Sequence, residues 1–238
     1  MGRAFEYRKE RKFKRWAAMA KSFTKVGREI AIAVKEGGTN PEANSRLRLA
    51  MQNARACNMP KANVEAAIKR ASSKEAENYS EIVYEGYAPH GIAVLVETTT
   101  DNPTRTVANI RHIFSKFGGS LGTSGSVDYL FFRKGKFVIK AENIQPEELE
   151  FELIDFGLDE LKVEGDEIIL YTTYEDFGTM QVALENKNIE ALNSELVRIP
   201  TIYKTLNDDE VEDVIRLIEK MEEDEDVVNV FHTMDESE

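Results

Sequence analysis

The residues that could do chemistry in this sequence are mainly arginines and lysines near its start. Eight of them are spaced so that they could contact a row of negatively charged groups: Arg11, Lys12, Lys14, Lys21, Lys25, Arg28, Arg48 and Arg55. Side chains of these two types position proteins on the phosphates of nucleic acids. We therefore expect these eight residues to bind phosphates.

A ninth cation lies in a different setting. Arg105 stands at the start of an expected helix, within the segment Asp101–Thr106, in a part of the chain that is rich in acidic residues. One interpretation is that it also contacts a nucleic acid. The other is that it forms an ion pair with Asp101 or Glu97, and the sequence leaves both open.

The distribution of charge supports a polyanionic partner. Residues 1–75 contain 18 Lys and Arg against 7 Asp and Glu, whereas residues 76–238 contain 13 against 36. Such an asymmetry is typical of a protein with one end that meets nucleic acid and another that keeps it soluble. The alternative for residues 1–75 is a solvated basic surface that has no ligand.

Sequence patterns that would indicate catalysis, metal binding or cofactor binding are weak in this chain. The histidines His90, His112 and His232 and the single cysteine, Cys57, are far apart in the sequence, so no zinc site is expected. His112 and Ser115 lie three residues apart but have no evident third partner for nucleophilic catalysis. We therefore expect no enzyme activity, no cofactor and no small-molecule substrate.

The glycine-rich segment 118–125 resembles a phosphate-binding loop only in composition. It follows an expected helix and precedes an expected strand, whereas phosphate loops run from a strand into a helix. A tight structural loop is the favoured interpretation.

The elements that must position the cations begin with three helices. From Trp16 to Val34 the apolar residues recur every three or four positions, which predicts an amphipathic helix with its lysines and Arg28 on the opposite side. Asn40-Pro41 and Pro60 indicate two further helix starts. Residues 1–75 are therefore expected to form a three-helix bundle. The first 13 or so residues are either an arm that orders on nucleic acid or a frayed terminus.

The acidic remainder predicts two α+β units. Strands near 81–85, 92–99 and 127–132 surround a helix, and residues 134–202 then follow the order β-α-β-β-α-β of the ferredoxin-like fold. A last helix, 208–222, and strand, 227–231, cannot form a core alone and must return to the first unit. The expected class is α+β, with a helical domain at 1–75, a middle domain at 76–132 and 203–238, and a ferredoxin-like domain at 133–202 inserted in it.

Several segments already described resemble those of the YebC/PmpR family. They are Gly37–Pro41, Asn44–Arg48, Asn58–Pro60, Tyr84–Gly91, Asp101–Thr106, Gly118–Gly122 and Gly125–Val127. The resemblance implies a helical N-terminal domain and two α+β domains, the third inserted in the second. Two departures are the start, Gly2-Arg3-Ala4-Phe5, where the family usually has a Gly-His-Ser-Lys-Trp-Ala-like segment, and His90, where glycine is common.

The resemblance also implies nucleic-acid binding. Most members are labelled probable transcriptional regulators that bind DNA, and the family includes the mitochondrial translational activator of cytochrome oxidase subunit one. The leading expectation is a non-enzymatic DNA-binding transcriptional regulator. The alternative is a translation factor that binds ribosomal RNA and relieves stalled ribosomes, and a protein-interaction scaffold is a third class.

Location and assembly follow from what the sequence lacks. The longest apolar run near the start, Ile30–Val34, is too short for a signal sequence or a membrane span, and one cysteine suits a reducing compartment. We therefore expect a cytoplasmic protein with no membrane partner. No leucine-zipper-like seam is evident, so the chain is either a monomer or a weak dimer.

Overall fold

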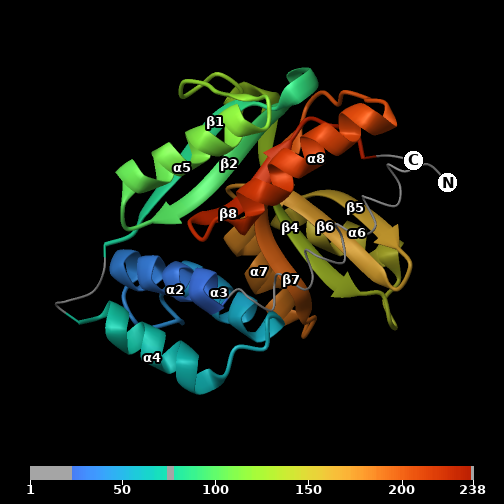
Figure 1. The fold of residues 1–238 in the computed structure, drawn as a ribbon. Helices are drawn as coiled ribbons and strands as arrows, with labels where there is room; N and C mark the ends of the chain where they lie inside the picture. The colour runs from blue at the N-terminus through green and yellow to red at the C-terminus, as the bar shows by residue number, and fades with distance from the viewer. Residues whose placement is uncertain (1–22, 74–77, 237–238) are drawn as a thin grey trace.

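The computed structural model describes residues 23–73 and 78–236. It shows an α+β protein in which a group of helices lies beside two four-stranded antiparallel sheets (Figure 1). Of the expected phosphate-binding residues, Arg11, Lys12, Lys14 and Lys21 lie outside the described residues, and so does the stretch from Trp16 to Ser22 that was expected to be helical.

The helical module consists of α2 (Phe23–Gly37), α3 (Ser45–Ala56) and α4 (Lys61–Ala71). Its core holds the apolar stripe of α2, Val26, Ile30 and Val34, against Leu47 of α3 and Val64 of α4. Burial of such side chains contributes about 1.5–3 kcal/mol each, and this drives the three helices together.

Helix α3 begins four residues later than the sequence predicted. Asn44, not Asn40, is the N-cap: its side-chain oxygen accepts a hydrogen bond from the Leu47 amide at 3.0 Å. Its side-chain amide also donates to the carbonyls of Ala33 at 2.7 Å and Gly38 at 2.8 Å, which ties the end of α2 to the start of α3. Asn44 is buried where the two helices meet, and it has additional hydrogen-bond partners there. These contacts explain why Asn44 caps the helix.

The first sheet has the strand order β3-β1-β2-β8. Its elements are β1 (Ser80–Tyr87), η1 (Pro89–Gly91), β2 (Ala93–Thr100), α5 (Pro103–Lys116), β3 (Ser120–Leu121), α8 (Asp208–Glu223) and β8 (Val227–His232). Helices α5 and α8 pack on one face and share a core with the strands, in which Val94, Phe114 and Ile218 are fully buried. Strand β8 pairs with β2, which is the return that the sequence predicted for the last helix and strand.

The second sheet has the order β5-β6-β4-β7. Its elements are η2 (Asp128–Leu130), β4 (Phe131–Lys140), α6 (Pro146–Leu153), η3 (Ile154–Phe156), β5 (Leu158–Glu164), β6 (Glu167–Thr173), α7 (Phe177–Asn186) and β7 (Ala191–Pro200). From β4 to β7 the order is the β-α-β-β-α-β of the ferredoxin-like arrangement. Phe137, Leu153, Leu170 and Met180 lie in the core between this sheet and its two helices.

The expected break between a strand at 127–132 and another from 136 is wrong. Asp128–Leu130 form a short 3-10 turn, and β4 then runs without interruption from Phe131 to Lys140. The reason is that β7 extends equally far, so that Phe131 and Phe132 find partners in Pro200 and Ile199. Residues 132 and 133 therefore lie inside one strand.

The glycine-rich loop after α5 is a structural loop, as the sequence favoured. The buried carboxylate of Glu85 accepts hydrogen bonds from the amides of Gly125 at 2.7 Å, Val127 at 2.7 Å and Asp128 at 2.8 Å. Burial alone would raise the pKa of Glu85, but these three bonds lower it below its usual range. The amides that could have held a phosphate are thus occupied by a side chain of the protein itself.

Candidate nucleic-acid interface

Helix α4 is the outermost element of the helical module. Figure 1 shows α2 and α3 between α4 and the two sheets, and α2 contacts β2 while α3 contacts β7. Val64 and Ala71 of α4 face the module core, and Ala67 and Ile68 pack beside them. The opposite face of α4 is therefore turned toward solvent, away from the acidic part of the chain.

That outward face carries an excess of positive charge. Lys61, Lys69 and Arg70 of α4 are exposed, and so is Arg55 at the end of α3. Lys61 is 3.8 Å from Glu65, an exposed pair four residues apart that contributes little. Within the described residues, the side chains of Arg55, Lys69 and Arg70 form no hydrogen bond or ion pair, so that their donors are available to phosphate oxygens.

Arg28 was expected to contact phosphates from the side of its helix opposite the apolar stripe, but the structure engages its side chain within the protein. Its guanidinium reaches the first sheet, where Nη1 donates to the carbonyls of Thr99 at 3.0 Å and Glu225 at 2.8 Å and to the Asp226 carboxylate at 3.0 Å. Only 12% of the Arg28 side chain is exposed. The helix face opposite the module core is covered here by another part of the protein.

Asp226 is the hub of this contact. Its side chain, 3% exposed, also accepts hydrogen bonds from Arg105 Nη2 at 2.9 Å and from the hydroxyls of Thr106 at 2.8 Å and Thr100 at 3.2 Å. Burial by itself raises the pKa of Asp226, but the bonds from Arg105 and Thr106 lower it overall. The ionised carboxylate therefore joins α2, β2 and α5 at one point.

Arg105 is likewise committed within the protein. Beside its contact to Asp226, it pairs with Asp101 at 2.8 Å, which is one of the two partners that the sequence offered as the alternative to nucleic acid. Hydrogen bonds to Asp226 and then Asp101 raise its pKa further above an already high value. Through Nη2 these two carboxylates hold the permanently charged guanidinium, while 45% of the side chain stays exposed.

Lys25 and Arg48 take intermediate positions. Arg48 donates to the carbonyls of Pro41 and Glu42, both at 2.8 Å, and so holds the loop that precedes α3. Lys25 is half-buried where the helical module meets the first sheet, and burial lowers its pKa although the nearby Glu222 raises it. Of the expected residues that the structure describes, Arg55 alone is exposed and has a side chain free of such contacts.

Two arginines with structural roles gave no signal in the sequence. Arg46 lies 2.7 Å from Glu36 and also pairs with Glu81 of β1. Arg198 of β7, 8% exposed, pairs with Glu97 at 2.8 Å and Asp128 at 2.7 Å and thereby joins the two sheets. Their partners are distant in sequence, and spacing alone cannot identify them. The exposed cations of α4 could have been identified from the sequence, because the apolar residues of this helix indicate which of its faces points outward.

Within residues 23–73 and 78–236, no three or more His, Cys, Asp or Glu side chains gather in a way that could hold a metal ion. Over the same residues, no helix has the length and apolar character needed to cross a membrane.

Comparison with known proteins gives consistent matches over the chain. Residues 3–74 match the TACO1/YebC protein N-terminal domain, and residues 79–234 match the TACO1/YebC second and third domain. A probable transcriptional regulatory protein of Flavobacterium psychrophilum, FP0835, is 58% identical over 99% of this chain and 100% of its own length. A probable transcriptional regulatory protein of Parabacteroides distasonis is 56% identical over 99% of this chain and 98% of its own.

A solved structure shares the fold. The crystal structure of a conserved hypothetical protein, Aq1575 from Aquifex aeolicus, superimposes with a TM-score of 0.80 at 38% sequence identity. The match covers 90% of this chain and 89% of that one. From the two domain matches and the full-length relatives, we conclude that the chain belongs to the TACO1/YebC family.

Proposed function

We propose that this protein is a non-enzymatic, cytoplasmic DNA-binding protein that regulates transcription. The names of its relatives support this role. The observation that carries the proposal is the outward face of the helical module, where Arg55, Lys69 and Arg70 have no partner within the described residues. A row of cations without counter-charges, at the far side from the acidic sheets, is suited to phosphates.

The proposed interface differs from the one expected from sequence. It comprises Arg55, Lys61, Lys69 and Arg70, joined by four residues outside the described part of the chain, Arg11, Lys12, Lys14 and Lys21. Arg28 and Arg105 are left out because Asp226 holds both. Lys25 and Arg48 act as supports, since their donors or surroundings already belong to the protein.

This mode of binding reads the backbone of the duplex. Lys and Arg on phosphates release counterions and give affinity that falls steeply with salt, without recognising bases directly. The acidic residues of 76–238 repel the rest of the duplex, so that one side of the protein alone can face it. In this proposal the shape of the duplex provides the selectivity. We assign binding to a domain of residues 1–75. For the other two domains we propose 76–130 with 201–238 and 131–200, because the expected boundary at 132/133 would cut β4.

The first test compares two triple variants of equal charge. Arg55→Gln/Lys69→Gln/Arg70→Gln removes three proposed contacts, and Arg111→Gln/Lys116→Gln/Lys140→Gln removes three exposed cations of the two sheet units. Fluorescence anisotropy with duplex DNA is measured over a range of salt. With about five phosphate contacts, the logarithmic slope for the parent protein is about −4 to −5, and three lost contacts reduce it by about 2.7.

The outcome separates local contact from general charge. We expect the flattened slope in the first triple variant only, with the control retaining the parent slope. Equal losses in both variants would show that no defined face binds. In cells, crosslinking followed by sequencing of DNA and RNA is expected to enrich promoters, and ribosomal RNA without a promoter signal would contradict transcriptional regulation.

A further inference from the structure

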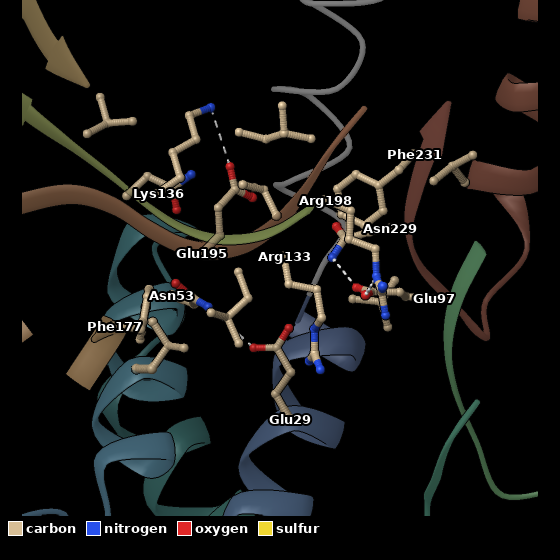
Figure 2. A pocket seen from close by; sticks show the side chains of 18 of the residues that line it. Glu29, Asn53, Glu97, Arg133, Lys136, Phe177, Glu195, Arg198, Asn229 and Phe231 are labelled. Atoms are coloured by element: carbon tan, nitrogen blue, oxygen red, sulfur yellow. Dashed lines mark hydrogen bonds and ion pairs between the residues drawn. The ribbon is translucent and has the colours of Figure 1, made fainter. Parts of the chain in front are cut away.

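A groove of about 1820 Å³ lies where the helical module and the two sheets meet. Figure 2 shows its composition at close range: Glu29 and Asn53 come from α2 and α3, Lys136 and Glu195 from the second sheet, and Glu97 from the first. None of the described residues proposed to contact nucleic acid lines the groove, although Ala56, Cys57 and Asn58 next to Arg55 do. We treat the groove as a second surface that adjoins the proposed interface.

The lining of the groove is acidic. It contains ten Asp and Glu residues against five Lys and Arg. Most of the five cations are already engaged: Arg46 pairs with Glu81, Arg198 with Glu97, and Lys136 lies 3.6 Å from Glu195. The negative charge in excess attracts a cationic occupant and repels a nucleic acid.

Three of these acids are unpaired within the described residues. Glu164 and Glu167 lie directly opposite each other across β5 and β6, and Glu175 follows shortly after β6. Like charges facing each other across neighbouring strands destabilise a sheet, and a bound cation would relieve this repulsion. This edge of the groove lacks positive charge.

Aromatic rings accompany the acids. Tyr171, Tyr174, Tyr203 and Phe231 also line the groove, and Tyr174 and Tyr203 are partly or largely exposed. The guanidinium of Arg133 stacks on Tyr174 at 3.9 Å from the ring centre, which shows that a ring of this groove accepts a cation. The groove thus suits a peptide that contains both basic and aromatic residues.

The chain itself contains such a peptide. Residues 1–22 hold eight Lys and Arg against two Glu, together with the aromatic residues Phe5, Tyr7, Phe13 and Trp16. This segment is followed directly by α2, which begins at Phe23. Because Lys25, Val26 and Glu29 of α2 line the groove, the C-terminal end of the segment is attached at the rim of the groove. Twenty-two residues span up to about 70 Å when extended, which gives ample reach.

We propose that the groove binds residues 1–22 of the same chain and releases them to nucleic acid. Docking neutralises the acidic lining and withholds Arg11, Lys12, Lys14 and Lys21 from phosphates. Nucleic acid and groove therefore compete for one segment, and the groove weakens binding to nucleic acid. The proposal that residues 1–22 bind in the groove is argued from the groove and this segment alone, whereas the proposed competition with nucleic acid also rests on the proposed function.

The sequence provides a reporter at the right place, because Trp16 is the single tryptophan of the chain. The full-length protein is compared with Glu164→Gln/Glu167→Gln/Glu175→Gln, which removes three negative charges from the groove. The matched control, Glu142→Gln/Glu150→Gln/Glu185→Gln, removes three from exposed positions of the same unit outside the groove. Trp16 emission and its quenching by acrylamide are measured for each protein, and anisotropy with duplex DNA follows.

We expect Trp16 to be shielded in the parent and in the control, and the groove variant to be quenched about twice as strongly. The groove variant is also expected to bind duplex DNA more tightly than the control. Trp16 that is shielded alike in all three proteins would overturn docking and place this residue on the helical module. Trp16 that is equally accessible in all three would overturn it as well. Release of Trp16 without a gain in DNA affinity would confirm docking and refute the competition.

Discussion

Replacement of Asp226 by Asn tests whether the helical module is held to the first sheet by a charged contact. Asp226 is nearly inaccessible and accepts hydrogen bonds from Arg28, Arg105, Thr100 and Thr106. The amide of Asn keeps one acceptor, but its NH2 group faces donors where a carboxylate oxygen stood. The Arg28 guanidinium then stays buried without a counter-charge.

The size of the effect follows from the burial of the pair. Removing one partner of a buried ion pair costs about 3–5 kcal/mol. The two carbonyls that Arg28 also contacts, those of Thr99 and Glu225, soften the loss. We therefore expect Asp226→Asn to lower the free energy of unfolding by about 3 kcal/mol. For a chain of 238 residues this corresponds to a fall in Tm of roughly 6–12 °C.

The assay is urea unfolding of a double-mutant cycle, followed by circular dichroism. It comprises the parent, Asp226→Asn, Arg28→Met and the double variant, with Asp155→Asn as an exposed control. We expect a coupling energy of about 1–3 kcal/mol between the two sites and no measurable effect of the control. A coupling energy near zero, or a loss below 1 kcal/mol in Asp226→Asn, would refute a charged contact between module and sheet.

The same cycle has a defined dependence on pH. Because the folded pKa of Asp226 lies below its unfolded value of about 3.9, the stabilisation is complete above that value and disappears as the pH falls through the folded pKa. The difference between parent and Asp226→Asn is thus expected to be constant from about pH 5 to 8 and to shrink only in acid. A difference that changed near neutral pH would assign the effect to another group.

Three further substitutions test the loop and the module core. Glu85→Gln places an NH2 group opposite amides that in the parent donate to a carboxylate, among them those of Gly125 and Val127. This substitution is expected to lower the free energy of unfolding in urea by about 2–4 kcal/mol. An unchanged unfolding midpoint would contradict the role of Glu85. Ile30→Ala, at a fully buried position, is expected to cost about 3 kcal/mol, and Phe23→Ala, 37% exposed at the start of α2, less than about 1 kcal/mol. Equal costs for the two would show that Phe23 belongs to the core.

Sequence periodicity was sufficient for much of the fold. The apolar stripe of α2 and the alternating strands around 134–202 depend on contacts within one element or between near neighbours, and the structure has them. The order of elements around the glycine-rich loop likewise argued against a phosphate site, and Glu85 fills it. In each case the local pattern already determines which side of an element is apolar.

The face opposite an apolar stripe could not be interpreted in the same way. Periodicity shows that Arg28 points away from the core of its own module, but it contains no information on what lies beyond. Solvent and a second domain are equally compatible with the pattern, and the structure places Asp226 there, 198 residues later in the chain. The same limit applies to Arg198, which joins the two sheets through Glu97 and Asp128. Both contacts depend on how separate units pack, which no local spacing records.

The helical module therefore divides its positive charge between two uses. Cations that face inward, Arg28 and Arg46, hold carboxylates of the first sheet, whereas Arg55, Lys69 and Arg70 face outward. Exposed charges are screened beyond about 8 Å at physiological ionic strength, while buried pairs are screened much less. Salt that weakens the proposed phosphate contacts of α4 is thus expected to leave the contact at Asp226 largely intact. The strong positive charge of residues 1–75 consequently overstates the proposed phosphate-binding surface, because part of that charge holds the module to the first sheet.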